Sequence, residues 1–126
     1  DEDNTKEVVR VVKYDDDWNR IGQCSITSKN VYEPFAKGPL RMTENDGILY
    51  IHTSRYIYWD AAAEPEEIHH EVNLTYAVDE DSMECVMNEA PGDWVSHSFA
   101  QFILSDGESV YRLDLGDANP RAAIGL

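Results

Sequence analysis

The sequence predicts an all-β fold built from antiparallel hairpins, and three observations support this prediction. No segment of helical length carries apolar residues at the 3.6-residue period of an amphipathic helix. Short runs rich in β-branched and aromatic residues follow one another along the chain. Asp, Asn, Gly and Pro separate these runs, as is typical of turns. The length leaves room for one domain with a modest core, so we expect residues 1–126 to form a single all-β module.

The first half of the chain contains two expected hairpins joined by a polar connection. Residues 1–6 are highly charged and are expected to be loose. Three consecutive aspartates, residues 15–17, are expected to form the first turn. The dipeptide Asp46-Gly47, which is typical of tight hairpins, is expected to form the second. The expected strands of this half occupy residues 7–14, 20–26, 40–42 and 48–59.

The second half follows a loop at residues 60–67, which has room for one helical turn but is too short for a stable helix. Residues 80–82 are expected to form the third turn, and residues 105–108, which contain Asp106-Gly107, the fourth. The expected strands of this half occupy residues 72–79, 83–87, 95–104, 110–115 and 122–126.

Two kinds of turn recur at an interval of about 60 residues, which indicates an internal repeat. Asp46-Gly47 returns as Asp106-Gly107, and the acidic turn at residues 15–17 is echoed at residues 79–81. The two kinds alternate along the chain, so each repeat contains two hairpins. Four antiparallel strands per repeat is the arrangement of a β-propeller blade.

We therefore predict antiparallel four-stranded β-propeller-type blades, about two and a half of them, in a partial propeller. Residues 7–27 are expected to form the last hairpin of one blade, residues 40–87 a complete blade, and residues 95–126 a partial blade. A ring needs more blades, typically about four to eight. The uncovered blade faces therefore predict self-association or packing against the remainder of a larger parent protein. The alternative is a self-contained β-sandwich or barrel.

Two expected strands carry apolar side chains on both faces. In residues 48–59, Tyr50 and Tyr56 alternate with Ile51 and Ile57, and residues 95–104 show a similar pattern. A sheet with one solvated face would alternate between apolar and polar residues. We therefore expect these strands to be covered on both sides, as in stacked blades or in the core of a sandwich.

Charge excludes several partners. Ten Lys and Arg residues against 25 Asp and Glu residues give a formal net charge of −15, which disfavours nucleic acid and anionic membrane surfaces. Membrane insertion is not expected, because no apolar run approaches the ~20 residues of a membrane-spanning helix.

Cys24 and Cys85 are the two cysteines. We expect two buried thiols, with a disulfide as the alternative; a zinc site would need two further ligands.

Three stretches of the sequence are similar to a known group of proteins. They are His69-His70-Glu71-Val72-Asn73-Leu74-Thr75, Trp94-Val95-Ser96-His97-Ser98-Phe99-Ala100-Gln101-Phe102 and Leu115-Gly116-Asp117-Ala118-Asn119-Pro120-Arg121. They resemble a propeller-like region of large uncharacterised bacterial proteins that are secreted or surface-bound. The family pattern reads His-His-Gln, Ser-His-Ser-Phe-Asn-Gln-Phe and His-Gly-Asp-Ala-Tyr-Pro-Arg, so this chain departs from it at Glu71, Ala100, Leu115 and Asn119.

The resemblance covers roughly Gly38 to the C-terminus. It implies a propeller-type fold and a secreted or cell-surface location, and the family has no established activity. The ligand-binding residues expected from this resemblance and from loop position are Trp59, His69, His70, His97 and Arg121. Aromatic residues beside Asp, Asn and His at loop mouths suit a carbohydrate or peptide ligand. The alternative is that these aromatic residues pack between blades.

The histidines and acidic turns raise the question of a metal. His69 and His70 are adjacent, so in an extended segment their side chains point to opposite faces. One of them with His97 and Glu71 could hold an ion. We favour ordinary hydrogen bonding for these residues and for His52, so no metal is predicted. The acidic turns offer oxygen ligands for calcium. Because Asp is also the residue that turns prefer, we predict no cofactor and keep calcium at these turns as the alternative.

These observations predict a non-catalytic binding or interaction module, for carbohydrate or peptide, within a larger propeller or assembly. The sequence contains no Gly-x-Ser-x-Gly nucleophile elbow and no phosphate-binding Gly-rich loop. One alternative is a polysaccharide hydrolase fragment that uses carboxylates such as Glu71 and Asp117. A purely structural assembly fragment is the other.

Overall fold

The structure is a computed structural model, and it describes residues 7–27, 31–35, 39–58, 69–89, 101–116 and 123–125. Across these ranges the regular secondary structure is antiparallel β-sheet, which confirms the predicted all-β class. The prediction for residues 1–6 lies outside the described residues. The described strands are β1 (Glu7–Tyr14), β2 (Arg20–Thr27), β3 (Val31–Glu33), β4 (Arg41–Asn45), β5 (Ile48–Tyr58), β6 (His69–Asp79), β7 (Cys85–Glu89), β8 (Gln101–Ser105), β9 (Val110–Gly116) and β10 (Ala123–Gly125).

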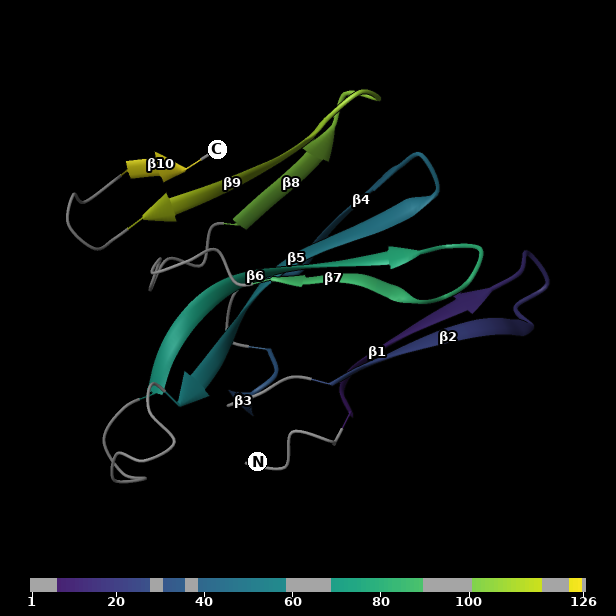
Figure 1. Cartoon of the computed structure of the whole chain (residues 1–126), viewed down its shortest axis with the longest axis horizontal. Helices are drawn as coiled ribbons and strands as arrows, with labels where there is room; N and C mark the ends of the chain where they lie inside the picture. Colours follow the sequence, from purple (N-terminus) through teal and green to yellow (C-terminus); the bar gives the residue numbers. More distant parts are fainter. Residues whose placement is uncertain are drawn as a thin grey trace.

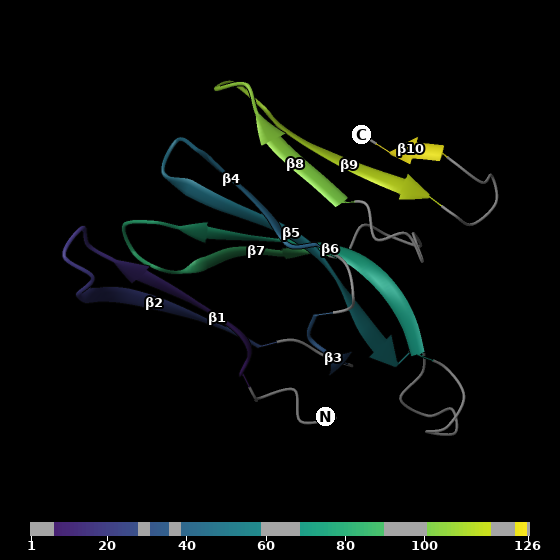
Figure 2. The same cartoon turned by 180° about the vertical axis from the view of Figure 1, so that it is seen from behind.

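The described strands form three sheets. Sheet A is the β1–β2 hairpin, and sheet C contains β8, β9 and β10. Sheet B contains β4, β5, β6 and β7 paired in chain order, with β3 beside the far half of β5. Sheet B lies between the other two, as Figure 1 and the reverse view in Figure 2 show. Among the strands that the structure describes, no pairing closes a sheet into a barrel.

Strand β3 corrects the sequence prediction, which placed these residues in a polar connection. Val31 is paired with Ile57, and Glu33 with Tyr56. β4 pairs with β5 only from Ile48 to His52, so the far half of β5 would otherwise present unpaired backbone groups. β3 fills that edge. Two paired positions are too few to leave a periodic signal in the sequence.

Four hairpin turns lie at the same edge of the stack in Figure 1, between β1 and β2, β4 and β5, β6 and β7, and β8 and β9. Gly47 and Gly107 both adopt the left-handed conformation, with φ of 75° and 94°. Trp18 and Met83, in the two acidic turns, also have positive φ, of 63° and 57°. The turns that echo one another in the sequence therefore share backbone features as well as composition.

The aspartates of the acidic turns close those turns through their carboxylates. Asp15 Oδ1 accepts hydrogen bonds from the backbone N–H of Asp17 and Asn19, at 3.0 and 2.8 Å. Asp79 Oδ1 accepts from the Ser82 N–H at 2.7 Å. The Asn19 side chain and N–H lower the pKa of Asp15, and the N–H and hydroxyl of Ser82 lower that of Asp79. The folded pKa values lie below the ordinary range, so this stabilisation is complete above it and is lost as the pH falls below about 4.

Sheets A and B share an apolar core. Side chains from both sheets are buried there: Val9, Cys24, Ile26, Ile51, Leu74, Tyr76 and Val78. At its rim Lys13 Nζ donates to the Glu80 carbonyl oxygen at 2.8 Å. Gly22 lies close to Met83: a Cβ at position 22 would be 2.7 Å from Met83 Cγ, so the Met83 side chain or the strand would have to shift.

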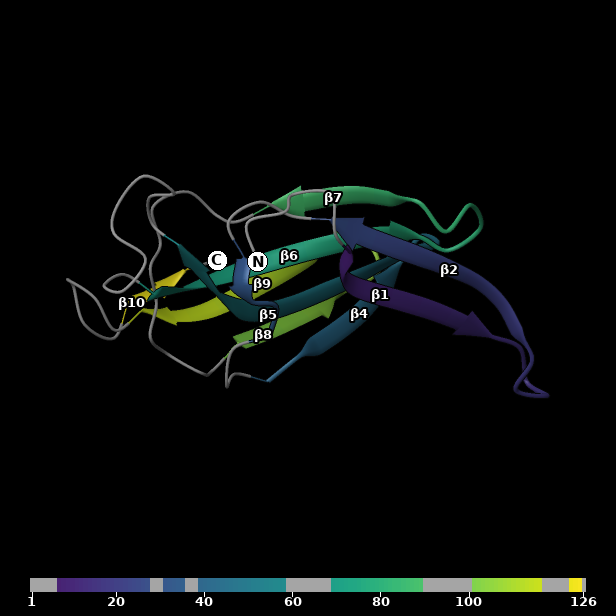
Figure 3. The same ribbon diagram turned by 90° about the horizontal axis from the view of Figure 1, so that it is seen from below.

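Strand β6 is buried on both faces, as every residue from Glu71 to Val78 is buried. One face, which includes Leu74 and Tyr76, packs against sheet A. The opposite face, which includes Asn73 and Thr75, is directed toward sheet C. Figure 1 shows β6 between β9 and β2, and Figure 3 gives the view of the same stack from below. The central sheet is therefore covered on both sides, but the second interface is polar, and it contains the candidate site.

Candidate functional site

Polar side chains are concentrated where sheet B faces sheet C. His52 on β5 and Asn73 on β6 come from sheet B, while Gln101 on β8 and Asp114 on β9 come from sheet C. His52 and Gln101 are 0% exposed, Asn73 is 1% exposed and Asp114 is 8% exposed. Because water does not reach these four side chains, their polar atoms must form hydrogen bonds with one another or with the backbone.

The His52 ring is held through both of its nitrogens. Nδ1 lies 2.9 Å from the Leu74 carbonyl oxygen and 3.2 Å from Thr75 Oγ1, and Nε2 lies 2.6 Å from Asp114 Oδ1. A carbonyl oxygen only accepts hydrogen bonds, so we assign a hydrogen to Nδ1. The short contact from Nε2 to the carboxylate also requires a hydrogen between the two atoms. Neither ring nitrogen is left to exchange a proton with a bound molecule.

The Asp114 carboxylate binds two side chains in addition to His52, and a third is linked to it through Asn73. Oδ1 accepts a hydrogen bond from Asn73 Nδ2 at 2.8 Å, and Oδ2 forms an ion pair with Arg112 Nε at 3.3 Å. Asn73 Oδ1 in turn accepts from Gln101 Nε2 at 3.0 Å. Asp114 is therefore the centre of a polar bridge between the two sheets.

Strand register explains why these side chains meet. His52 is directly opposite Thr75 in the β5–β6 pair, and Gln101 is directly opposite Asp114 in the β8–β9 pair. Residues opposite one another in an antiparallel pair project from the same face of the sheet, with Cβ atoms about 5 Å apart. Each sheet thus presents a short row of polar groups, and stacking places the two rows in contact.

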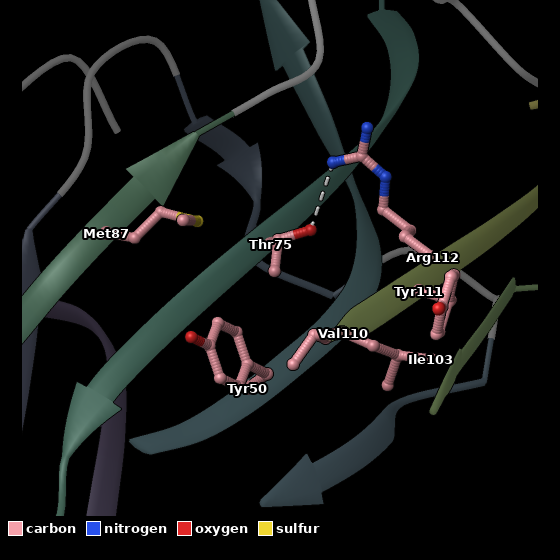
Figure 4. Close-up of a pocket in the computed structure, with 7 residues that line it drawn as sticks. All are labelled: Tyr50, Thr75, Met87, Ile103, Val110, Tyr111 and Arg112. Atoms are coloured by element: carbon pink, nitrogen blue, oxygen red, sulfur yellow. Dashed lines mark hydrogen bonds between the residues drawn. The ribbon is translucent and has the colours of Figure 1, made fainter. Parts of the chain in front are cut away.

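A pocket of about 300 Å³ opens beside this bridge. It is lined by Tyr50, Thr75, Met87, Ile103, Val110, Tyr111 and Arg112, shown in Figure 4. Arg112 Nη1 donates a hydrogen bond to Thr75 Oγ1 at 3.2 Å, which joins the pocket to the buried network. The Arg112 side chain is 33% exposed. Within the described part of the chain, its Nη2 has no hydrogen-bond partner, so donors remain for a bound molecule.

The arrangement provides the chemistry of binding. Tyr50 offers an aromatic ring, and Arg112 and Thr75 offer polar groups at fixed positions. Both nitrogens of His52 are hydrogen-bonded within the described part of the chain, so this ring holds the two sheets together. Among the described residues, no group of three or more His, Cys, Asp or Glu side chains is arranged to hold a metal ion.

The residues predicted from sequence are placed as follows. Trp59, His97 and Arg121 lie outside the described residues. His69 and His70 begin β6, where they pair with Tyr58 and Ile57; their backbone is described and their side chains are not.

Two further sequence predictions involve side chains that could carry chemistry. The sequence offered two interpretations of His52, a metal ligand or a residue that makes ordinary hydrogen bonds. In the structure both of its ring nitrogens are hydrogen-bonded. Glu71, a carboxylate of the hydrolase alternative, is 1% exposed, and Asp117 lies outside the described residues. A carboxylate as buried as Glu71 could not reach a polysaccharide chain without a rearrangement of β6.

Sequence reasoning missed the residues at the centre of the site, which are Asn73, Gln101, Arg112 and Asp114. A weak signal was present, since Arg112 and Asp114 alternate with apolar residues in the run 110–115. The same alternation is typical of a strand with one solvated face. Only the stacking of sheet C on sheet B shows that this polar face is covered.

The chain was compared with protein families, curated proteins and solved structures. No family model matches the chain, and neither the curated proteins nor the solved structures include a match. Across the ranges described, no helix has the length and apolar character needed to cross a membrane.

Proposed function

We propose that the chain is a non-catalytic carbohydrate-binding module made of propeller-type blades, with its ligand site in the pocket between sheets B and C. The observation that carries this proposal is the position of Arg112. Its guanidinium is held by Asp114 and Thr75 and lines an open pocket beside Tyr50. Its Nη2 hydrogens are available to donate hydrogen bonds to a ligand. Such fixed polar groups beside an aromatic ring are characteristic of small-molecule binding sites.

The topology supports the blade arrangement. β4, β5, β6 and β7 follow one another as a four-stranded antiparallel meander, which is the strand order of a blade. The β1–β2 hairpin lies against one of its faces and the sheet of β8, β9 and β10 against the other (Figure 1). On this proposal sheet A ends one blade, sheet B contains a full blade and sheet C begins the next.

The chemistry of the pocket favours a neutral sugar over an anion. A sugar presents hydroxyl groups, whose oxygen atoms can accept hydrogen bonds from the Arg112 guanidinium. Its C–H face can pack on the Tyr50 ring. Asp114 offsets the charge of Arg112, and the net charge of −15 repels anions. A polysaccharide is also a common component of the cell-surface environment that the sequence resemblance implies.

The test is calorimetric titration with neutral disaccharides, for which cellobiose and N,N′-diacetylchitobiose are suitable probes. We expect saturable binding that weakens about tenfold or more in Arg112→Gln and in Tyr50→Leu, since each removes a contact worth roughly 1.4 kcal/mol. Tyr14→Leu is the matched control, because Tyr14 is an exposed tyrosine of sheet A. It should leave binding unchanged.

Three outcomes would contradict this function. Equal binding in the wild type and the Arg112 variant would place the ligand elsewhere. Saturation by a neutral tripeptide, with no response to either sugar, would favour a peptide ligand. Release of monosaccharide during the titration would favour the hydrolase alternative.

The outward face of sheet C supports the second part of the proposal, that the module works within a larger propeller or assembly. Phe102 and Leu104 project from this face and are 50% and 47% exposed, whereas the opposite face of the same strands covers sheet B. Adjacent exposed apolar side chains of this size are typical of interaction surfaces. Sedimentation velocity over a range of concentrations tests self-association: we expect the mass to rise with concentration, and a monomer throughout would contradict it.

A further inference from the structure

The two cysteines of the chain meet across the interface of sheets A and B. Cys24 lies on β2 and Cys85 on β7, and both belong to the apolar contact between these sheets. Two flanking contacts align these strands: Gly22 lies against Met83, and Asn88 Nδ2 donates to the Thr27 carbonyl oxygen at 3.1 Å. Cys24 and Cys85 occupy the matching position between these two contacts, although 60 residues separate them in the sequence. Both are free thiols in the structure. The contact therefore brings together two oxidisable groups from different sheets.

The two thiols differ in access. Cys24 is 3% exposed, whereas Cys85 is only partly buried and its Sγ also donates to the Met87 carbonyl oxygen at 3.1 Å. An oxidant from solution would therefore reach Cys85 first. Cys24, on the facing strand, is shielded from the oxidant but lies beside Cys85 in the interface. This is the arrangement of an attacking and a resolving cysteine.

We propose that Cys24 and Cys85 form a thiol–disulfide exchange site that reacts with low-molecular-weight disulfides such as glutathione disulfide and cross-links sheet A to sheet B. The inference rests on the matching positions of the two cysteines in the interface of sheets A and B and on their unequal exposure. It is independent of the carbohydrate site, which lies at the other face of sheet B.

The reaction proceeds in two exchanges. Cys85 loses its proton, and its thiolate attacks one sulfur of glutathione disulfide, which forms a mixed disulfide and releases one glutathione thiolate. Cys24 then loses its proton and attacks the Cys85 sulfur, which forms the Cys24–Cys85 bond and releases the second glutathione thiolate. The two released thiolates take up the two protons. Two protein thiols are thus oxidised by two electrons, and one molecule of glutathione disulfide is reduced to two of glutathione.

The cross-link should also stabilise the fold. It closes a loop of about 60 residues, which reduces the conformational freedom of the unfolded chain. We expect the melting temperature to rise by roughly 10 °C. Dithiothreitol should reverse the rise, because it restores the thiols.

The test incubates the reduced full chain with excess glutathione disulfide at mildly alkaline pH, where thiolate is more abundant. The protein is then denatured in iodoacetamide and examined by mass spectrometry. We expect a wild-type mass lower by two hydrogens, no alkylated cysteine, no retained glutathione and a peptide that links residue 24 to residue 85. The higher melting temperature of the same sample gives a second measurement that needs no variant.

Two variants separate the roles of the thiols. Cys24→Ala should retain glutathione on Cys85, because the resolving thiol is absent, and its melting temperature should not rise. Cys85→Ala should leave Cys24 unmodified until denaturation, because Cys24 is buried. Glutathione retained by the wild type, alkylation of both its cysteines, or a cross-link between two chains would each overturn the proposal.

Discussion

Asp114→Ala is expected to lower the free energy of unfolding by about 3 kcal/mol, because it leaves the His52 ring and the Asn73 amide buried without their shared acceptor. Both groups are at most 1% exposed, so water cannot replace the carboxylate. Urea unfolding followed by tryptophan fluorescence measures the change. Asp16→Ala is the matched control, since the Asp16 side chain is exposed in the first turn, and it should cost less than about 0.5 kcal/mol.

A double-mutant cycle then tests whether the loss comes from the bridge itself. In a His52→Leu background, Asp114→Ala should cost at least about 1 kcal/mol less than in the wild type, because one of its partners has already been removed. Additive losses from the two variants would show that His52 and Asp114 do not act together. That result would contradict the assignment of the polar network as the bridge between sheets B and C.

Leu74→Ala should have an effect of similar size, about 3 kcal/mol, at the opposite face of β6. Leu74 is 0% exposed and packs in the core between sheets A and B, so truncation removes apolar contacts and leaves a cavity. Leu40→Ala makes the same chemical change at a site that is 40% exposed and should cost less than about 1 kcal/mol. The midpoints of urea unfolding of the two variants give the comparison.

Equal losses in the two leucine variants would mean that sheet A does not cover β6 as described. The two experiments together distinguish the interfaces of sheet B. Leu74→Ala tests its apolar contact with sheet A, and Asp114→Ala tests its polar contact with sheet C.

The hairpins were predictable because their signals are local. Alternation and β-branched composition define β1, β2, β5 and β6, and Asp-Gly or clustered aspartates mark the turns between strands. The sixty-residue echo of Asp46-Gly47 at Asp106-Gly107 corresponds to a shared left-handed conformation at the two glycines. Strand β3 was not predicted, because its three residues are ordered by the free edge of β5 and not by a pattern of their own.

The candidate site was not predictable to the same extent. His52 was recognised as a residue of interest, but its partner Asp114 lies 62 positions away, on a different sheet. The alternation of polar with apolar residues in β6 and β9 is the same for a solvated face and for a buried polar interface. The five predicted ligand residues, Trp59, His69, His70, His97 and Arg121, have no described side chains and remain predictions.

The amino-acid sequence by itself determined the β class, the turns and the alternation of side chains along each strand, because these depend on neighbours a few residues apart. Only the tertiary structure decided which faces are covered, that one interface of sheet B is apolar and the other polar, and that Cys24 meets Cys85. The physical reason is that burial is a property of two surfaces in contact. The side-chain pattern of one strand does not determine which other sheet will pack against it.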